Sequence, residues 1–525
     1  MSTTQTIDIT IPPSSDEQIV QFNLHIPPTT TPSPGPVPKM LFGTNTLSND
    51  ATQGAGMWNN VGHQFTGWYS VGGAIISYDN NGYPQVVSGP ASTAQAACWT
   101  DLYGYPTGTY ILRWKGPSPT SLLIRNKNLT PTGPDSSGYY QANVTFTAGD
   151  HVEMRCPSPG GISDVSLFPP NLTQSRTFTD TYINLLKPYK VCRLMPMSRA
   201  NGKELSPGVI TLFNNWSQRT LPSVWSQTDK DCAWEYCLQL CKEASVVPWI
   251  NIPFGADDSY INSLAQLVKS YSFPSIILEH SNEYWNQGWG YQWAALTQKA
   301  TSLGIYGTDP NIAGPSYHAD LLLHAGDIFK NTVGSVYTVL GAQAVYERWA
   351  YYALLWAKQH PTQYPINALA VAPYFMQSDS DDISTVAKLV TSAQNWVTTY
   401  LVPGMQKNKT VADSYGCDFT TYEAGQSFVD GSGNAPATEK QWNASISAAQ
   451  YQAYMAGSKR MIQTDPAISQ LYQQNVNICS SLNIKHYMHF MLVSNWGRSG
   501  FWGLKQASDD ADGPKSNFFN QLITS

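Results

Sequence analysis

The sequence predicts a (β/α)8 barrel preceded by an antiparallel β-sandwich, and two observations indicate this fold. After about residue 160, apolar runs typical of buried strands alternate with amphipathic helical patterns. Such alternation is typical of a parallel sheet whose strands are joined by right-handed helical crossovers. From residue 40 to 160, short β-rich segments are separated by Gly, Pro and Asp turns without a helical period, which is typical of an antiparallel sandwich.

The chain therefore divides into three predicted parts. Residues 1–39 form a Pro- and Thr-rich extension, in which PPTTTPSPGPVP favours an extended linker. Residues 40–160 form the accessory β-sandwich, and residues 161–525 form the barrel. The strands of the sandwich are expected within 108–116, 120–129, 139–149 and 150–156.

Seven apolar runs predict barrel strands two to eight, and the first strand is expected near 164–170 (DVSLFPP). Eight such units fit a barrel better than an open doubly wound sheet, although the pattern alone leaves that alternative open. The seven runs are 191–197, 246–253, 275–283, 335–344, 367–375, 418–425 and 486–496. Helical patterns between them cover 229–245, 259–271, 344–360 and 383–401.

Composition limits the classes of partner. Charged residues make up 13% of the chain and the net charge is −6, whereas a nucleic-acid partner would favour a basic protein. Seventeen Trp and 30 Tyr on a largely uncharged background suit a neutral, hydroxyl-rich ligand such as a carbohydrate. The same composition also suits a weakly charged secreted protein, so it does not decide the function by itself.

Several other classes find no support in the sequence. No run of 18 apolar residues predicts a membrane span, and no signal peptide is recognisable, although an extracellular or surface location is the expectation. No Gly-rich nucleotide motif or GxSxG follows a strand, and the eight cysteines contain no CxxC. We therefore expect no cofactor and no metal, interpret Cys237 and Cys241 as core thiols, and leave the oligomeric state open.

Two carboxylates end predicted strands. SIILEHSNE, strand four, ends in Glu283, and DFTTYEAG, strand seven, ends in Tyr422, Glu423 and two small residues. Active sites of (β/α)8 barrels lie at the carboxyl ends of the strands, where strands four and seven are nearly opposite. A retaining glycosidase needs two carboxyl groups about 5–5.5 Å apart. One such Glu alone is more often an ion-pair partner or a helix cap, but two at these strands predict the catalytic pair.

Strand alternation makes two further predictions. Glu279 shares a face with Glu283 and lies one layer deeper, where it is expected to hold Arg193 or the neighbours of His280. A role for Glu279 as the catalytic acid is the less favoured alternative. Strict alternation would turn Asn282 away from Glu283, so the strand end is expected to contain a twist or bulge.

The motifs SNEYWN (281–286) and TTYEAGQ (420–426) resemble the acid/base and nucleophile motifs of glycoside hydrolase clan A. That clan comprises retaining (β/α)8 hydrolases, including cellulases, β-mannanases, xylanases and β-glycosidases. The resemblance covers roughly residues 165–525 and implies a carbohydrate substrate whose β-glycosidic bonds are cleaved. It implies Glu283 as general acid/base and Glu423 as nucleophile.

The same resemblance implies substrate-binding residues. Asn282 would lie near the sugar 2-hydroxyl, Arg193 and Tyr374 would lie beside the nucleophile, and Trp496 would form the sugar-stacking floor. The stretch at the end of strand three, WINIPFGADD, lacks the His of the best-known members, so the family within the clan stays open. Aromatic faces stack on sugars but also fill cores; on this basis two further sugar contacts are predicted, Trp249 and Trp285.

A different class of function is the alternative. The chain could be a carbohydrate-binding or structural surface or virion protein that keeps a hydrolase scaffold without turnover. The missing signal peptide and the Pro- and Thr-rich leader keep this alternative open. The intact carboxylate pair favours the enzyme, because a protein that only binds carbohydrate does not need it.

Overall fold

The computed structural model describes residues 40–46, 56–90, 93–170, 176–206, 209–211, 215–430, 433–439 and 446–524, with side chains except at 203–211 and 289–291. The chain divides into two compact units, Met1–Lys39 and Met40–Ser525. The predicted extension over residues 1–39 lies outside the described residues, so everything below concerns the second unit.

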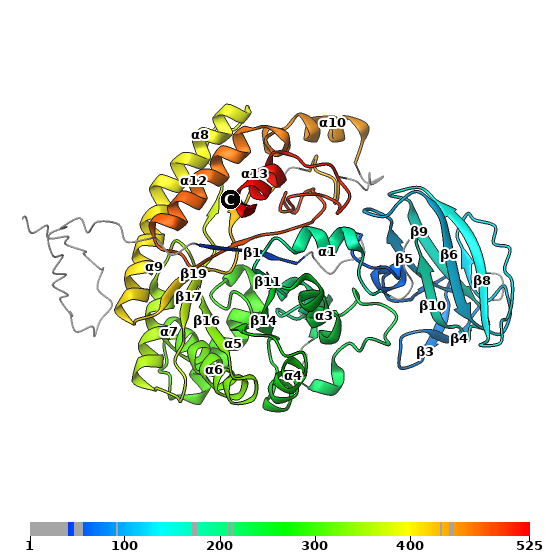
Figure 1. Ribbon diagram of the computed structural model, residues 1–525, viewed down its shortest axis with the longest axis horizontal. Coiled ribbons are helices and arrows are strands. Elements are labelled where there is room, and N and C mark those ends of the chain that lie inside the picture. The colour runs from blue at the N-terminus through cyan, green and yellow to red at the C-terminus, as the bar shows by residue number, and fades with distance from the viewer. Residues whose placement is uncertain are drawn as a thin grey trace, which may run out of the picture. The chain divides into compact units, whose positions relative to one another are not determined.

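Eight parallel strands form the barrel (Figure 1). Strands two to eight coincide with the predicted runs, and strands four and seven are the two that were expected to present carboxylates. In sheet order they are β19 (Asp418–Thr421), β17 (Ala368–Val371), β16 (Val336–Gly341), β15 (Ile276–His280), β14 (Val247–Ile252), β11 (Val191–Arg193), β1 (Leu41–Asn45) and β21 (His486–His489).

The two edge strands, β19 and β21, close the barrel on each other. The backbone N–H of Lys485 donates to the carbonyl of Phe419 at 2.9 Å. One step further along, the hydroxyl of Thr421 donates to the carbonyl of His486 at 3.1 Å and accepts from the backbone N–H of Met488 at 2.9 Å. A threonine side chain thus replaces part of the ladder and satisfies backbone groups at the edge of β21.

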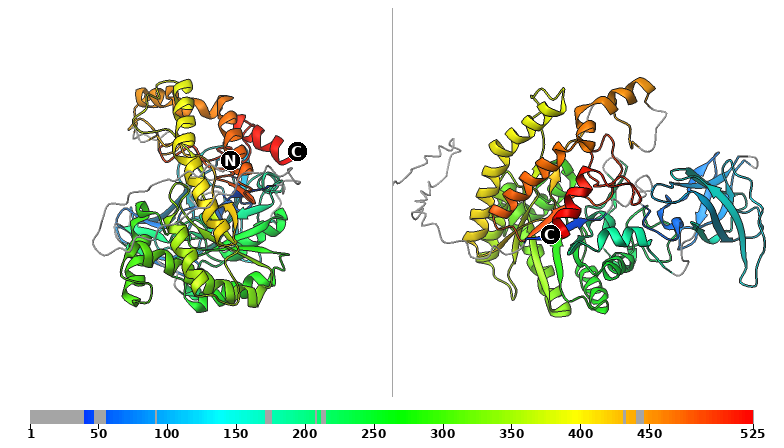
Figure 2. Two further views of the ribbon diagram at one scale, coloured as in Figure 1. Left: turned by 90° about the vertical axis from the view of Figure 1, so that its left-hand side faces the viewer. Right: turned by 45° about the horizontal axis from the view of Figure 1, so that its top comes forward.

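Helices cover the outside of the barrel (Figure 1). In both views of Figure 2, helix α8 runs beside α12, with which it is in contact. The longer helices are α1 (Asp180–Leu186), α3 (Trp234–Ala244), α4 (Asp258–Ser270), α5 (Gly290–Leu303), α6 (Pro310–Val333), α7 (Arg348–Gln359), α8 (Val386–Trp396), α9 (Val402–Ser414), α10 (Ala448–Ala456), α12 (Ala467–Ser481) and α13 (Pro514–Thr524). Shorter elements are α2 (Met195–Ser198), α11 (Ser458–Met461), the 3-10 helices Trp216–Gln218, Gln287–Trp289 and Ile462–Thr464, the π-helix Val397–Leu401, and the strand pairs β12 (Lys203–Ser206) with β13 (Val209–Thr211) and β18 (Tyr374–Phe375) with β20 (Gly425–Gln426).

The first barrel strand differs from the prediction. The segment predicted over 164–170 does form a strand, β10 (Ser163–Phe168), but it pairs antiparallel with β6 (Gly108–Lys115) rather than joining the barrel. Strand β1 takes its place and pairs in parallel with β11 and β21. The barrel therefore begins at β1, inside the predicted accessory segment, and the antiparallel strands are inserted between β1 and α1.

The inserted strands form three antiparallel sheets, and they share one apolar core (Met154, Trp114 and Phe146 are examples). Their arrangement as a sandwich remains a prediction. The sheets are β10–β6–β8, β2–β5–β9–β7 and β3–β4, with β2 (Tyr69–Val71), β3 (Ile75–Tyr78), β4 (Pro84–Ser88), β5 (Gln95–Asp101), β7 (Leu123–Ile124), β8 (Tyr139–Phe146) and β9 (His151–Pro157), accompanied by the 3-10 helix Val61–Gln64.

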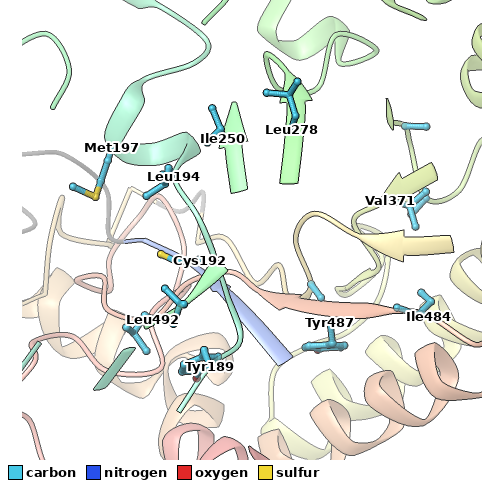
Figure 3. Close-up of a cluster of buried hydrophobic side chains, with 14 of the residues drawn as sticks. Tyr189, Cys192, Leu194, Met197, Ile250, Leu278, Val371, Ile484, Tyr487 and Leu492 are labelled. Carbon is cyan, nitrogen blue, oxygen red and sulfur yellow. The ribbon is translucent and has the colours of Figure 1, made fainter. Parts of the chain in front are cut away.

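Alternate residues of each barrel strand point inward and outward. Cys192, Ile250 and Leu278 belong to the large cluster between strands and helices, part of which is drawn in Figure 3. Their neighbours Val191 and Ile277 belong to a separate cluster inside the barrel. The polar residues that follow on the inward face are therefore carried to the open end of the barrel.

Small residues inside the barrel make room for large ones. A Cβ on Gly43 of β1 would lie 2.2 Å from Sδ of Met488 and 3.0 Å from Cβ of Val191. Ala368 and Ala370 of β17 occupy the same interior cluster as Trp249 and are fully buried with it. The strand sequence thus leaves volume near the barrel axis for wide side chains.

No helix among the described residues is long and apolar enough to cross a membrane. The eight cysteines are free, and Cys237 and Cys241 are buried on α3, as expected of core thiols. Within the described part of the chain, no group of three or more His, Cys, Asp or Glu side chains is arranged to hold a metal ion.

Candidate active site

Strand β15 ends in a turn that breaks the alternation of the strand. Ser281 has φ +58° and Glu283 has φ +47°, both in the left-handed region that non-glycine residues rarely occupy. The turn is held because Asn251 donates from its amide to the carbonyl of Ser281 at 2.9 Å and Ser281 donates from its hydroxyl to Gln292 at 2.8 Å. This is the irregularity that the sequence required for Asn282 and Glu283 to face one site.

Arg193, at the end of β11, is the centre of the site. Its guanidinium is fully buried, and all five of its N–H donors are directed at acceptors from other strands. The acceptors are both carboxylate oxygens of Glu279 (2.9 and 3.1 Å), Oδ1 of Asn45 (3.1 Å), Oε1 of Glu423 (2.8 Å) and Oδ1 of Asn282 (2.8 Å). With all five hydrogen bonds formed, the planar guanidinium fixes the positions of four residues from three other strands.

Glu423 follows β19 and is 5% exposed. Its Oε1 accepts from Arg193, and its Oε2 accepts from the hydroxyl of Tyr374 at 2.7 Å. Burial raises the pKa of Glu423 to about 7, the charge of Glu283 adds to this, and Arg193 and the Tyr374 hydrogen bond lower it. Burial therefore favours the protonated form of Glu423, whereas its two hydrogen-bond donors favour the charged form.

Glu283 is half-buried and has a different set of donors. Its Oε1 accepts from the hydroxyl of Tyr422 at 2.9 Å, and its Oε2 accepts from the amide of Asn286 at 2.8 Å. Tyr422 immediately precedes Glu423, so Glu283 contacts the end of the strand that carries the other carboxylate. Both donors are neutral, in contrast to the arginine that binds Glu423.

Glu279 lies one layer below, where alternation placed it. It is 1% exposed, and besides Arg193 its Oε2 accepts from the indole of Trp249 at 2.9 Å and from the amide of Asn251 at 2.8 Å. Burial raises the pKa of Glu279, while the charge and hydrogen bonds of Arg193 oppose that rise. Glu279 thus provides a buried negative charge that balances the arginine from the side away from Glu423.

One positive and three negative groups meet at this site when all are ionised. Burial lowers the pKa of Arg193, but the charges of Glu279 and Glu423 outweigh burial and raise it, so the arginine is charged. Burial and the charge of Glu283 both raise the pKa of Glu423, so the two carboxyl groups interact electrostatically at this site.

Tyr374, which contacts the nucleophile, belongs to a cluster of three partly exposed aromatic side chains. The ring of Tyr374 lies 5.4 Å from that of Trp502 and 6.4 Å from that of Phe490, centroid to centroid, and Phe490 lies 5.4 Å from Trp502. Phe490 follows the last residue of β21 directly. We call Tyr374, Phe490 and Trp502 the aromatic wall.

The structure brings Arg193, Asn282, Glu283, Tyr374 and Glu423 together, as the resemblance to clan A implied. The distance between the carboxyl groups of Glu283 and Glu423 remains a prediction of about 5–5.5 Å.

The predicted tryptophans lie differently. Trp249 has no exposed surface, because it fills the barrel interior and donates to Glu279, so it presents no face to a sugar. Trp496 is 7% exposed, and Lys515 and Arg460 lie over its ring at 4.2 and 5.0 Å. Trp285 is half-buried against the interior cluster, and its role as a sugar contact remains a prediction.

Several site residues were missed by the sequence analysis. Asn45 could not be found because its strand was not recognised, and it also donates from its amide to the carbonyl of Tyr422 at 3.2 Å. The phenol of Tyr422 was visible in the motif, but its bond to Glu283 depends on the turn at Ser281. Phe490 follows strand eight directly, where the signal was a cluster of aromatics.

The fold of this chain is similar to the folds of several solved structures. No family model matches the chain, and no curated protein matches it. The chain is similar to the crystal structure of the GH51 arabinofuranosidase from Xanthomonas axonopodis pv. citri, with 10% identity, 67% of each chain covered and a TM-score of 0.40. It is also similar to the CBM22-1–GH10 modules of endo-1,4-β-D-xylanase 10B from Clostridium thermocellum, with 11% identity, 89% and 96% covered and a TM-score of 0.33.

A third solved structure in this group is the Podospora anserina GH26–CBM35 β-(1,4)-mannanase, with 10% identity, 90% and 97% of the two chains covered and a TM-score of 0.26. The solved structures named here are thus glycoside hydrolases of different families. Their identities and TM-scores are too low to carry an argument about function, which rests on the geometry of the site.

Proposed function

We propose that this protein is a retaining glycoside hydrolase that cleaves β-glycosidic bonds of a poly- or oligosaccharide by double displacement. The observation that carries the proposal is the pair Glu283 and Glu423. They come from the ends of strands four and seven, each accepts from its own tyrosine, and the charge of one raises the pKa of the other. Two coupled carboxyl groups at one barrel mouth are the machinery of this reaction.

The unequal donors support an assignment of roles. Glu423 accepts from a guanidinium and a phenol, which favour the carboxylate required of a nucleophile. Glu283 accepts only from neutral donors, a phenol and an amide, which stabilise a carboxylate less than a guanidinium does. Glu283 is therefore the general acid and Glu423 the nucleophile.

The reaction then runs in two steps. Glu283 gives its proton to the glycosidic oxygen while Glu423 attacks the anomeric carbon, which breaks the glycosidic bond and forms a glycosyl-enzyme ester. In the second step Glu283, now a carboxylate, takes a proton from water as the water oxygen attacks the anomeric carbon. The carboxylate of Glu423 leaves, and the anomeric configuration is retained.

Asn282 is suited to bind the sugar at this centre. Its Oδ1 is engaged by Arg193, and among the described residues no acceptor is bonded to its amide nitrogen. That nitrogen can donate to the 2-hydroxyl of the sugar, a contact that strengthens in an oxocarbenium-like transition state. The aromatic wall offers partly exposed ring faces and edges for the sugar next to Glu423.

The experiment begins with hydrolysis of aryl β-glycosides and of a panel of β-glucan, mannan, xylan and galactan. On the best substrate, Glu423→Gln should lower kcat by several orders of magnitude with folding intact, because an amide cannot form the ester. The matched control Glu243→Gln changes the same group on the outer helix α3 and should leave kcat within about twofold.

Glu283→Ala tests the other role. It should slow substrates with poor leaving groups most, and azide, which needs no base, should restore turnover of an activated aryl glycoside as the β-glycosyl azide. Wild-type activity in both variants would refute the assignment. A wild type that binds glycans but hydrolyses none of the panel would favour the alternative, a non-catalytic carbohydrate-binding or structural protein.

A further inference from the structure

A second feature lies on the same side of the barrel as the carboxylates. An open cavity of about 820 Å³ is lined by the segment that follows β18, the segment that follows β20, and helices α10 and α11. These segments connect strands six and seven to their helices, and such connections lie at the catalytic end of a (β/α)8 barrel.

The cavity adjoins the nucleophile along two paths. Strands β18 and β20 pair in parallel, and the backbone N–H of Ser427 donates to the carbonyl of Phe375 at 2.9 Å, which keeps the two segments together as they leave the site. Met376, two residues after Tyr374, and Ser427, four residues after Glu423, both line the cavity. At about 3.3 Å per extended residue, these paths are about 7 and 13 Å long. A chain of a few linked sugars bound at Glu423 can therefore reach it.

The lining suits an uncharged ligand that carries many hydroxyl groups. Met376 and Ile383 provide apolar surface, and Gln377, Ser427 and Asn434 provide neutral hydrogen-bonding groups. The Oε1 atom of Gln377 is buried and has no hydrogen-bond partner in the described part of the chain. A buried amide oxygen without a donor is costly, and a sugar hydroxyl would satisfy it.

The charges of the lining argue against an anionic ligand. Its one lysine, Lys459, donates to the carbonyl of Val429 at 2.6 Å, so the ammonium is already engaged. Burial lowers the pKa of Lys459, and the two carboxylates that line the same cavity, Asp379 and Asp430, only partly oppose this effect. The balance of charge is thus negative, which disfavours phosphate, sulfated sugars and uronic acids.

We infer that this cavity is a distal subsite that binds the continuation of an uncharged glycan chain, so that the enzyme prefers long oligosaccharides to short ones. The inference rests on the proposed function, because it places the cavity along the path of a chain that is cleaved at Glu423. The subsite makes chain length, in addition to the sugar at the carboxylates, a determinant of specificity.

The test measures kcat/KM on a series of uncharged β-linked oligosaccharides of increasing length, taken from the polysaccharide that the wild type degrades. Gln377→Leu removes the amide at nearly constant volume, and Ser427→Trp fills the cavity. Gln377→Leu should lower the ratio of kcat/KM for the longest to the shortest oligosaccharide by about tenfold, the value of one hydrogen bond. Ser427→Trp should lower the same ratio because it blocks the cavity. The control Ser481→Trp, exposed at the end of α12 before β21 enters the barrel, should keep the wild-type ratio.

Thermal melts of the three variants show whether each is folded. If Ser427→Trp does not fold, the conservative variant Gln377→Leu decides the test. An unchanged length dependence in folded Gln377→Leu would overturn the inference of a distal subsite. It would not contradict the proposed hydrolase function. If the wild type hydrolyses nothing, calorimetric titration with cello-, manno-, xylo- and laminari-oligosaccharides replaces kinetics. Affinity that rises with length and falls in Gln377→Leu would support the subsite, and affinity indifferent to this substitution would overturn it.

Discussion

The hydroxyl of Tyr374 donates to Oε2 of Glu423 at 2.7 Å, while Arg193 donates to the other oxygen of the same carboxylate. The burial of Tyr374 and the charge of Glu423 raise the pKa of the phenol well above its ordinary value, so it stays protonated and remains a donor. The carboxylate is thus held at both oxygens, by a charged donor from strand two and a neutral donor from strand six.

Tyr374→Phe should therefore move the pH profile. Hydrogen bonds to the charged form lower the pKa of a carboxyl group, so loss of the phenol raises the pKa of Glu423 above about 7. Because the carboxylate is the reactive form, the acid limb of kcat/KM should shift to higher pH by about one unit. The control Tyr337→Phe removes a phenol bonded to Asp418 at 2.6 Å, at the opposite end of the barrel, and should leave this limb in place.

Arg193→Met should be destabilising because it leaves Glu279 and Glu423 buried without their cation. Breaking a buried ion pair by removing one partner costs about 3–5 kcal/mol. The double variant Arg193→Met/Glu279→Gln removes one of the two orphaned charges and should recover part of that loss in urea unfolding. Strict additivity of the two single changes would show that Glu279 and Arg193 are not coupled.

Gly43→Ala tests the close packing inside the barrel. Its Cβ would fall within contact of Sδ of Met488 at 2.2 Å, so Met488 must move, at a cost of about 1–3 kcal/mol in the free energy of unfolding. Met488→Ala shortens the opposing side chain and makes room for the new Cβ. The double variant Gly43→Ala/Met488→Ala should therefore lose less unfolding free energy than the sum of the two single variants. The control Gly433→Ala, where a Cβ would meet nothing within 4 Å, should change stability by less than about 0.5 kcal/mol.

The sequence predicted most of the fold and the centre of the site, for identifiable reasons. Strands four and seven were recognisable because each is an apolar run that ends in a carboxylate, and Glu279 followed from the two-residue period of the strand. Strand one was missed because the antiparallel insertion separates Leu41–Asn45 from the next barrel element and hides the alternation. Trp249 was predicted to contact the sugar because the two-residue alternation of a strand does not show how deep an inward-facing residue lies in the barrel.

Acid should destabilise the protein from about pH 6.5 downward, before most carboxylates titrate. Burial lowers the pKa of five histidines, so the unfolded chain, whose histidines titrate near 6.5, binds more protons than the folded one. They are His63 and His486 (about 4), His280 and His318 (about 3), and His489 (well below 6.5).

Three buried carboxyl groups oppose this effect, because their raised pKa lets the folded chain take up protons first: Asp231, Glu279 and Glu423. Each net proton that the unfolded chain binds in excess of the folded chain corresponds to about 1.4 kcal/mol per pH unit. Urea unfolding at pH 7 and 5.5 measures this slope, and His318→Gln should reduce it by about one proton. A stability that is flat over this range would contradict the prediction.

The antiparallel insertion should be required for a soluble barrel. Trp225, in the connection that follows strand two, is 2% exposed and packs into the core of the insertion, with ring centroids 5.6 Å from Phe65, 6.0 Å from Trp68 and 5.6 Å from Tyr83. The next residue, Ser226, donates from its hydroxyl to the carbonyl of Phe65 at 2.6 Å. The barrel thus contributes a tryptophan to the core of the insertion.

Replacing residues 56–176 by a short Gly-Ser linker would leave Trp225 without its apolar partners, and such exposed surface promotes association. We expect this variant to precipitate or to elute as aggregates in size-exclusion chromatography. In the full chain, Trp225→Ala should cost about 3–5 kcal/mol in unfolding free energy because it opens a cavity. The control Trp99→Ala, at a half-buried position of β5, should cost less. A soluble, monomeric deletion variant with full hydrolytic activity would show instead that the insertion is an independent module, dispensable for the barrel and its site.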